Sequence, residues 1–517
     1  MRENTIRRML TKLDGVRLGI DFGTTHTVVA LVDRGNTPVV SFEGGDFVPS
    51  LVALEEATGE RRYGWEAFAV RHEPGWTVIR SLKRRLDGAG PETELSIGRW
   101  RLPLGALLSG FFSALHRELV EASNAGLTAD EALTAAVSVP ANATTAQRFL
   151  TLEAFKAGDF AVEALLNEPS AAGFEYAHRY RRADPKREYL VVYDLGGGTF
   201  DASLLRMTGK TNEVVATNGV RRLGGDDFDE AILGLVLDRA SAGTLAGAPT
   251  GEARALLLEE CVRQKESLSP NTRRVLVDLA AIGKEPIVLP VDEIYAACAP
   301  LVERSLEAVE PLLAGPEGGG AILWSDIAGL YVVGGGALFP LVTRVLKERF
   351  GEKRVRRSPH PFAATAMGLA VFLDRDGGWA LEEKLSRHFG VFRESEAGTD
   401  VVFDPIFEKG TPLPAPGEPP VVVTRRYRAA HDIGHFRFLE CTRLTGGRPD
   451  GDVTPWDDAY FPFEPGLRAA DLSSAPIRRR EGGPEIGEDY ALGSEGAVTV
   501  TVTDATDGFA RMFRLTR

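Results

Sequence analysis

The chain has 517 residues, enough for two to four domains, and its 44% apolar and 26% charged residues are typical of a soluble globular protein. A formal net charge of -13 argues against nucleic acid or an anionic membrane as a partner of the whole chain. Cys261, Cys298 and Cys441 lack paired spacing, so neither a disulfide framework nor a zinc site is expected. The basic N-terminus has no apolar core, and no apolar run approaches the ~18–20 residues of a membrane span. We expect a cytoplasmic protein.

Residues 16–376 alternate short apolar strands with amphipathic helical stretches, which predicts an α/β fold with helices on both faces of the sheets. A helix is predicted to follow the strand at 132–140, with Asn142 as its cap and its end near Gly158. The clearest strands are expected at 16–23, 26–33, 132–140 and 330–333, and a further helix at 340–350.

Composition changes after about residue 376, where the turn-rich stretch "DRDGGW" interrupts the α/β pattern. Beyond residue 390 helical periodicity largely disappears, and "VVVTRRY", "HFRFLECTRL" and "AVTVTVTDA" alternate in strand fashion. We therefore expect a basic extension at 1–15, a first domain at 16–376, a linker at 377–385 and a smaller all-β domain at 386–517.

Two similar glycine turns stand about 170 residues apart, "GIDFGTTHT" (19–27) and "DLGGGTFD" (194–201). Each follows an apolar strand and leads into a second one, which predicts a tight β-hairpin. Glycine lets the backbone approach an anion closely, and successive N–H groups in such turns form anion-binding nests. The aspartates would repel phosphate unless a divalent cation lay between them, and Mg²⁺ suits that position. The pair predicts a nucleotide phosphate clamp between two similar half-domains.

Two further glycine turns accompany the pair. "VVGGGALFP" (332–340) leads from a strand towards a helix, which places backbone amides and a helix N-terminus beside a nucleoside or phosphate. "RLGGDDFDEAI" (222–232) places two glycines at a helix start. The sequence contains neither GxxxxGK[ST] nor GxGxxG, so P-loop and Rossmann folds lose support.

These turns, in this order, resemble the nucleotide-binding domain of the actin, hexokinase and heat-shock ATPase superfamily, and more narrowly the DnaK-type, seventy-kilodalton heat-shock chaperones. The segments "NEPSAAGFEYA" (167–177), "ATNGVRRLGGDDFDEAI" (216–232) and "RQKESLS" (263–269) share the likeness. It covers roughly residues 16–376, and "FEKGTPLP" and "VTVTVTDATDGFARM" resemble pieces of the family's peptide-binding β-sandwich. The implied fold has two similar actin-like lobes around a nucleotide cleft, followed by the β domain.

The resemblance implies an ATPase that uses ATP/ADP and Mg²⁺, with K⁺ a further candidate cation. Asp21 and Asp194 would position the metal together with Glu168, which would also orient or deprotonate the attacking water, while Thr199 and Asp201 would face the γ-phosphate. The implied nucleotide-binding residues are Gly23, Thr24, Thr25, Gly196, Gly197, Gly198, Thr199, Gly224, Gly225, Lys265, Ser269, Gly334, Gly335 and Gly336. Lys265 and Ser269 are expected one turn apart on a helix, where they would contact the ribose and adenine.

Several positions depart from the family pattern. The family's catalytic lysine is expected within 63–74, where Phe68 takes its place and Arg71 is a weak substitute. Without that cation at the γ-phosphate, hydrolysis is expected to be slow. Glu266, Leu338 and Phe362 also differ from the family's usual residues around the nucleotide. The linker "DGGWALEEKLSRHF" lacks the leucine-rich run, and no helical lid follows the β domain, so coupling between the domains is uncertain.

The favoured function is an ATP-binding chaperone that couples nucleotide state to an unfolded peptide or client protein, with J-domain and nucleotide-exchange co-chaperones as partners. The alternative is a nucleotide-binding scaffold or sensor with little hydrolysis and one dedicated protein partner; a small-molecule kinase is a third, less favoured interpretation.

Weaker features have simpler interpretations. His431 and His435 are interpreted as turn or surface histidines rather than metal ligands. The aromatic residues Trp456, Tyr460, Phe461 and Phe463 are interpreted as sandwich core. Basic clusters such as "KRR" (83–85) are interpreted as solvated side chains.

Overall fold

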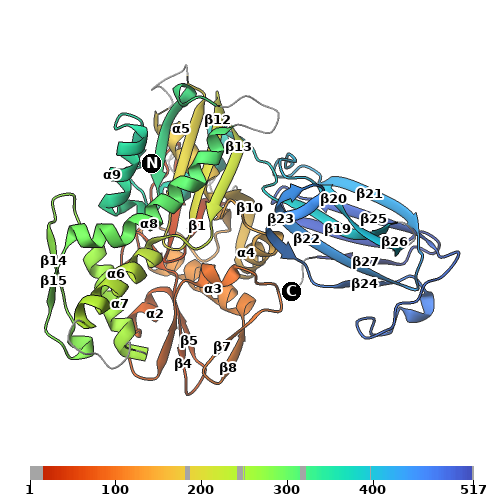
Figure 1. Ribbon diagram of the computed structural model, residues 1–517, viewed down its shortest axis with the longest axis horizontal. Coiled ribbons are helices and arrows are strands. Elements are labelled where there is room, and N and C mark those ends of the chain that lie inside the picture. The colour runs from red at the N-terminus through yellow and green to blue at the C-terminus, as the bar shows by residue number, and fades with distance from the viewer. Residues whose placement is uncertain are drawn as a thin grey trace.

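The computed structural model describes residues 15–180, 187–241, 249, 251–314, 322–395 and 398–514. Nearly all of the expected 1–15 extension therefore lies outside the described residues. Figure 1 shows a larger part of mixed helices and strands and, to its right, a smaller part built of strands.

Two sheets organise the α/β part. In spatial order the first contains β10 (Phe160–Asn167), β9 (Leu133–Val139), β1 (Val16–Phe22), β2 (His26–Leu31) and β3 (Val48–Pro49). The second contains β17 (Val355–Arg357), β16 (Ile327–Val333), β11 (Tyr189–Leu195), β12 (Phe200–Thr208), β13 (Thr211–Val220) and β18 (Ala380–Glu382). The strands expected around both glycine turns are confirmed.

The two sheets repeat one arrangement. β1 and β2 form an antiparallel hairpin, and β9 lies parallel to β1 on its other side. In the second sheet β11 and β12 form the antiparallel hairpin, and β16 lies parallel to β11. Each glycine turn therefore joins the equivalent pair of strands in its own sheet, β1 to β2 in the first and β11 to β12 in the second.

Helices cover the sheets, and α5 and α10 pack against one another between them. The helices are α2 (Gly64–Ala69), α3 (Leu104–Glu121), α4 (Thr145–Ala157), α5 (Glu168–Tyr180), α6 (Gly225–Ser241), α7 (Gly251–Glu266), α8 (Val291–Val309), α9 (Pro340–Phe350) and α10 (Ala364–Leu373). The α5–α10 contact is so close that a Cβ on Gly368 would lie 1.7 Å from the carbonyl oxygen of Ala171.

The predicted cap of α4 was wrong by two residues. Thr144, not Asn142, is the N-cap: its side chain accepts from the N–H of Gln147, whose side chain in turn accepts from the N–H of Thr144. This reciprocal capping box satisfies two free donors at once, whereas Asn142 lies in the preceding turn. The helix ends at Gly158, as predicted.

Smaller elements extend the two lobes. They are β4 (Val52–Glu55), β5 (Arg61–Tyr63) and β6 (Trp76–Ile79), the hairpins β7 (Glu94–Ile97)–β8 (Trp100–Pro103) and β14 (Arg274–Val277)–β15 (Ile287–Pro290), and the 3-10 helices η1 (Leu82–Leu86) and η5 (Gly335–Leu338).

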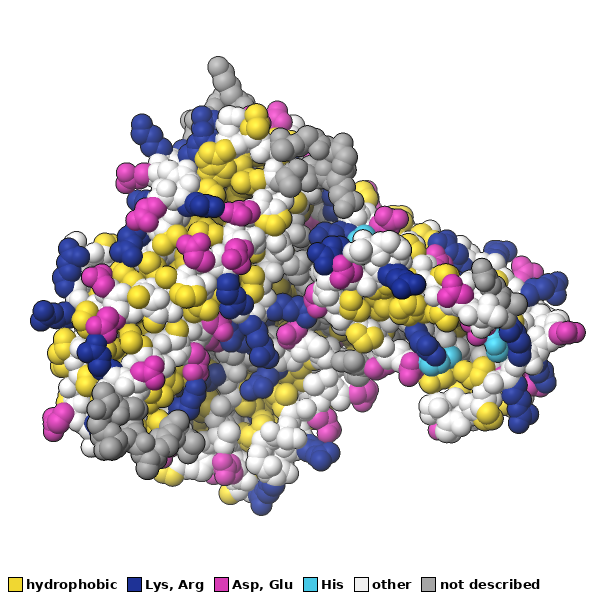
Figure 2. Space-filling model, viewed as in Figure 1, with side chains coloured by type: hydrophobic (Ala, Val, Ile, Leu, Met, Phe, Trp, Pro, Cys, Tyr) yellow, Lys and Arg dark blue, Asp and Glu magenta, His cyan; other side chains and the backbone are white. Residues whose placement is uncertain are grey.

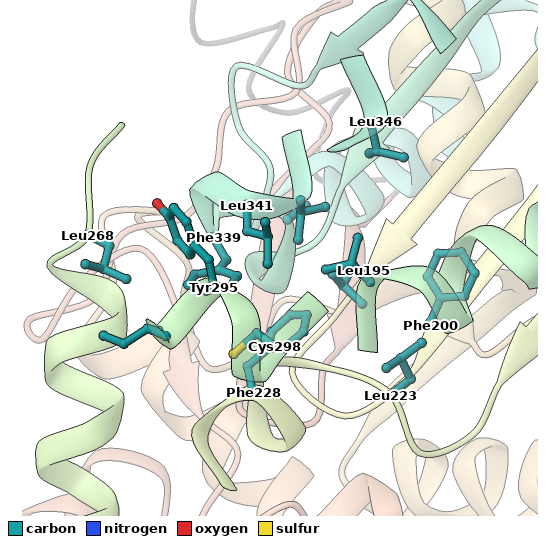
Figure 3. Close-up of a cluster of buried hydrophobic side chains, with 14 of the residues drawn as sticks. Leu195, Phe200, Leu223, Phe228, Leu268, Tyr295, Cys298, Phe339, Leu341 and Leu346 are labelled. Carbon is teal, nitrogen blue, oxygen red and sulfur yellow. The ribbon is translucent and has the colours of Figure 1, made fainter. Parts of the chain in front are cut away.

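The core of the second lobe anchors the glycine turns. Leu195 and Phe200 flank the triple-glycine turn, Leu223 and Phe228 flank the glycines at the start of α6, and Phe339 follows the third turn. All five side chains are buried in one cluster, which Figure 3 shows in close-up. Because glycine has no side chain to pack into a core, these apolar neighbours fix the three glycine turns against one common core.

The C-terminal part is a two-sheet β structure, as expected. One sheet contains β20 (Asp400–Phe407), β19 (His388–Ser395), β22 (Ile433–Thr445), β23 (Arg448–Pro455) and β24 (Ala459–Pro462). The other contains β21 (Val421–Arg428), β25 (Glu485–Leu492), β26 (Val498–Asp504) and β27 (Ala510–Phe513). Their inner faces share one apolar cluster, which includes Trp456, Phe461 and Phe463 as predicted.

Tyr460, the fourth residue of the aromatic set, and the two histidines His431 and His435 make contacts near the surface. Tyr460 is half-buried and stacks on His435 with ring centroids 4.6 Å apart. His435 also pairs with Asp458 at 2.7 Å, and His431 lies 3.7 Å from Glu394. In the described part of the chain no group of three His, Cys, Asp or Glu side chains is placed to hold a metal ion.

The segment expected as a linker is partly a strand. β18 pairs in parallel with β13 and so becomes the edge strand of the second α/β sheet. Glu383, which follows β18, is buried and accepts a hydrogen bond from the N–H of Asn167 at 3.1 Å. The chain between the two parts is therefore fixed to the α/β part rather than free.

Polar contacts join the β part to α4. Both carboxylate oxygens of Glu440, on β22, lie 3.2 Å from the N–H of Thr145 at the start of α4. Arg148, one turn further along, is buried and donates to the carbonyl of Glu495 at 3.0 Å and to the side chain of Asn167. In Figure 1, α4 lies beside β22 and β23.

Candidate functional site

The two glycine turns lie against each other. A Cβ on Gly197 would be 2.9 Å from Thr25 Oγ1, and one on Gly198 would be 2.7 Å from Thr24 Oγ1. Gly23 closes the first turn by donating to the carbonyl of His26 at 3.1 Å. The tertiary structure thus brings together the residues of the two predicted phosphate turns, although about 170 residues separate them.

The other two glycine turns meet the second hairpin from its far side. The N–H of Gly225 donates to the carbonyl of Gly196 at 3.0 Å, and a Cβ on Gly224 would lie 2.6 Å from the backbone of Gly197. A Cβ on Gly334 would lie 2.5 Å from Asp194 Oδ1, and one on Gly336 would lie 2.8 Å from the carbonyl of Gly196. Gly335 lies against the half-exposed ring of Phe362. All four turns therefore surround one point at the end of β11.

Four carboxylates and one lysine lie at that point. Asp21, the last but one residue of β1, accepts a hydrogen bond from Ser138 at 2.7 Å, and Asp201 accepts from the N–H of Ala141 at 3.1 Å. Lys83, from η1, is buried and pairs with Glu168 at the start of α5. Asp194 completes the group and is also buried.

Burial and mutual repulsion dominate the ionisation of these acids. Burial raises the pKa of Asp21 to about 6, although Lys83 opposes the shift, and raises the pKa of Asp201 to about 7. For Asp194 burial, reinforced by Glu168, Asp21 and Asp201, raises the pKa well above its ordinary range. Burial alone would lower the pKa of Lys83, but Glu168 and Asp21 outweigh it and the pKa is raised. Negative charge is therefore unfavourable at this point unless positive charge accompanies it, and Lys83 stays protonated.

The carboxylates suit a divalent cation held through its waters, since no three side chains of the described residues are placed to bind a metal ion directly. With all four acids ionised, one ammonium leaves the buried group strongly negative, and Mg²⁺ prefers carboxylates together with water and phosphate oxygens. Asp21 and Asp194, on equivalent strands of the two lobes, are the residues that would hold the metal, with Glu168 beside them. Bound there, Mg²⁺ would neutralise phosphate charge.

A lysine does lie among these carboxylates, but it comes from outside 63–74, the segment in which the family's lysine is expected. Phe68 is exposed to 37%, packs on Trp65 with ring centroids 5.4 Å apart, and lies under the guanidinium of Arg71. Arg71 donates to the carbonyl of Phe68 at 2.7 Å, so it does not substitute either. Lys83 is the lysine of the site, from a segment that was interpreted as solvated.

Only one residue of the "KRR" cluster is solvated. Leu82 and Leu86, four residues apart, are buried and carry η1 into the core of the first lobe. Lys83 is buried with them, Arg84 donates to Asp227 at 2.7 Å and to the carbonyl of Gly198 at 2.8 Å, and Arg85 is exposed. The flanking leucines were the signal in the sequence that this run is not a surface loop.

The expected nucleoside pair is not on one helix. Lys265 lies on the last turn of α7 and pairs with Asp229 at 2.8 Å and with the carbonyl of Gly225 at 3.0 Å. Ser269 lies beyond the helix end, which is at Glu266, and bonds to Thr272 at 2.9 Å. Lys265 therefore lies beside the glycines at the start of α6, whereas Ser269 is held in a separate turn.

A cavity of about 50 Å³ lies next to the carboxylate group. Thr24, Lys83, Thr199 and Asp201 line one part of it. The rest of the lining comes from Arg84, Asp87, Pro140, Asn142, Gln147, Phe200, Gly219, Val220, Arg221 and Arg222. The cavity thus continues from the predicted γ-phosphate residues towards the end of β13.

Two further observations concern the chain as a whole. No helix in the described part of the chain is both long and apolar enough to cross a membrane. The three cysteines are buried free thiols, and burial raises the pKa of Cys261 and Cys298 to about 12.

The sequence matches the family model of the Hsp70 protein over residues 113–374. A chaperone protein HscA homolog of Bordetella petrii is 34% identical over 372 residues, which cover 69% of this chain and 58% of the relative. The heat shock 70 kDa protein BIP3 of Oryza sativa subsp. japonica is 32% identical over 395 residues, covering 70% of this chain and 56% of the relative. An HscA homolog of Polynucleobacter asymbioticus is 30% identical over 428 residues, covering 77% and 65%.

The chain therefore spans between 56% and 65% of the length of these relatives. The family model covers half of the chain, including both turns that begin at Asp194 and at Gly334 and the glutamate at the start of α5. The chain belongs to the Hsp70 family.

Proposed function

We propose that this protein binds ATP with Mg²⁺, hydrolyses it, and couples the state of the nucleotide to binding of an unfolded peptide or client protein by the β part. The observation that carries the proposal is Lys83, a buried ammonium held by Glu168 where the turns of both lobes meet. Membership of the Hsp70 family supports the same activity.

The chain's own groups suit phosphoryl transfer to water. The turns at 23–25 and 196–198 offer backbone N–H groups and threonine hydroxyls to the phosphates. Lys83 would stabilise the charge of the transferring γ-phosphoryl group, and electrostatic stabilisation of this kind usually contributes most of the rate enhancement in phosphoryl transfer. Glu168 and Asp201, on either side of Lys83, would orient the attacking water and accept its proton. Slow hydrolysis stays a prediction, and Lys83 would supply the cation that residues 63–74 lack.

Four contacts support coupling, two that hold the segment leading into the β part and two that hold the β part itself on α4. β18 pairs with β13, Glu383 bonds to Asn167, Glu440 bonds to the start of α4, and Arg148 bonds to Glu495. Asn167 immediately precedes Glu168, so these contacts reach the residue next to the proposed water-orienting carboxylate. A nucleotide that favours one arrangement of Glu168 would shift the equilibrium of domain docking.

The test is to measure ATP hydrolysis by the full chain with Mg²⁺ and with EDTA, alongside the affinity of a fluorescent unfolded peptide in ATP and in ADP. Mg²⁺-dependent turnover and an affinity that differs between the two nucleotides are expected. Nucleotide binding without turnover or peptide binding would instead favour a scaffold or sensor with one dedicated partner. The co-chaperones of the family, J-domain and nucleotide-exchange proteins, are proposed partners that the same assay can detect as stimulation of turnover.

A further inference from the structure

The cavity beside Lys83 has a lining unlike that of a nucleoside pocket. Its residues come from η1 and the residue after it, the turn between β9 and α4, the segment 199–201 at the start of β12 and the segment 219–222 at the end of β13, with Thr24 from the first glycine turn. Among the described residues its lining includes none of the glycines of the third turn, nor Lys265 or Ser269. The cavity thus shares Thr24 and Thr199 with the predicted phosphate site but none of the described residues expected to bind the nucleoside.

Positive charge follows the cavity from the site to its outer end. All four cations line it: Lys83 is buried, Arg84 and Arg221 are half-buried, and Arg222 is exposed, so we call the end at Arg221 and Arg222 the outer end. Arg222 is exposed and forms no ion pair with any described residue. Figure 2 shows Lys and Arg side chains gathered near the middle of this face of the molecule. On a scale where one water needs ~10–15 Å³, the cavity of about 50 Å³ has room for more than one water.

An ion pair with the β part holds Arg221 of the outer end. Arg221 Nη1 pairs with Asp87 Oδ1 at 2.7 Å, and its other nitrogen pairs with Asp452 of β23. The same Asp452 oxygen is 2.7 Å from Nη1 of Arg387, which is buried between the two parts. Asp452 thus holds Arg221 across the outer end only while the β part is docked.

We propose that this cavity is the exit route for inorganic phosphate and that the Arg221–Asp452 pair is its gate. The inference rests on the proposed hydrolysis, which splits ATP and water into ADP and phosphate. While ADP remains bound, the nucleotide blocks the cleft on the nucleoside side, and the cavity leads the other way. Its arginines attract an anion through a narrow passage. When the β part undocks, Asp452 leaves, the outer end opens and Arg221 is free to draw the phosphate out.

The test separates cleavage from release. Single-turnover cleavage of ATP is followed by acid quench, and free phosphate is followed by a fluorescent phosphate-binding protein, both with the full chain. Asn142→Trp narrows the cavity from a turn, without changing a helix or strand, and should slow release at least fivefold while cleavage changes less than twofold. Asp452→Asn opens the gate and should speed release at least twofold. Arg85→Gln, exposed on the same 3-10 helix as Lys83, is the control and should match the wild type.

Each other outcome has a distinct meaning. Release within twofold of wild type in Asn142→Trp, or no acceleration in Asp452→Asn, overturns the route or the gate. Cleavage that falls in parallel with release also overturns the proposal, because the cavity would then admit water rather than pass phosphate. Absence of cleavage in the wild-type chain would refute the proposed hydrolysis itself, a result that the quench measurement gives independently.

Discussion

Lys83 donates a hydrogen bond to Glu168 between the first lobe and the start of α5, and both side chains are more than 90% buried. Such a buried pair is stabilised only while both charges are present. The ion pair joins η1 of the first lobe to α5, which packs against β11 and β12 of the second sheet. Its formation depends on the leucines that carry η1 inwards rather than on the glycine turns themselves.

Replacing Lys83 by methionine should abolish most ATP turnover while nucleotide binding persists. The change removes the only ammonium among the four carboxylates of the described site, of which three are buried and Asp21 is half-buried, and loss of one such electrostatic group typically costs ~10²–10³ in rate. Turnover and nucleotide affinity are measured on the same preparation, with Arg85→Gln as the matched control. Phe68→Lys should leave turnover unchanged, and a rise would contradict the placement of Lys83 as the site's lysine.

Replacing Glu440 by alanine should undock the β part. The carboxylate accepts from the N–H of Thr145 and from the indole of Trp456, and loss of a helix-capping acceptor costs ~0.5–2 kcal/mol. Small-angle scattering should report a larger radius of gyration, and protease should cut the segment around residue 384 faster. Glu481→Ala, an exposed position in the same part, serves as control. Unchanged scattering and cutting would rule out Glu440 as a docking residue.

Replacing His26 by asparagine should reduce the loss of stability in acid. Burial lowers the pKa of His26 from 6.5 to about 4. Its neutral form therefore contributes stability that is fully present above pH 6.5 and is lost as pH falls through about 4. At ~1.4 kcal/mol per pKa unit, the free energy of unfolding of wild type relative to the variant should fall by about 3 kcal/mol between pH 7 and pH 4. Chemical denaturation at both pH values, with exposed His178→Asn as control, checks this; parallel curves would contradict it.

Replacing Gly368 by alanine should destabilise the α/β part by about 1–3 kcal/mol or more. The added methyl would meet the carbonyl of Ala171 in the α5–α10 contact, where backbone cannot give way easily. Gly234→Ala is the matched control: it lies in α6 with no heavy atom within 4 Å of its Cβ position, so it should stabilise by about 0.4–1 kcal/mol. Thermal unfolding compares the two, and equal shifts would mean that the helix contact adapts.

The sequence alone determined the local elements and their chemistry. Apolar runs and glycines predicted the hairpins around 19–27 and 194–201, the strand before Gly334 and the helix Pro340–Phe350, because these depend on side-chain period and backbone freedom within a few residues. The change to strands after residue 390 was equally local. The same motifs supplied the resemblance to the Hsp70 family.

Only the tertiary structure decided which residues share a site. Lys83 is 85 residues from Glu168, and sequence spacing could not show that η1 turns its lysine inwards while Phe68 remains outside. Ser269 lay too far along the chain to remain on the helix of Lys265, because that helix ends at Glu266. The pairing of β18 with β13 and the capping of α4 by Glu440 likewise depend on where two distant segments meet. The local sequence of a glycine turn determines that it can bind phosphate, whereas long-range packing determines which charged side chain, here Lys83, lies beside the turn.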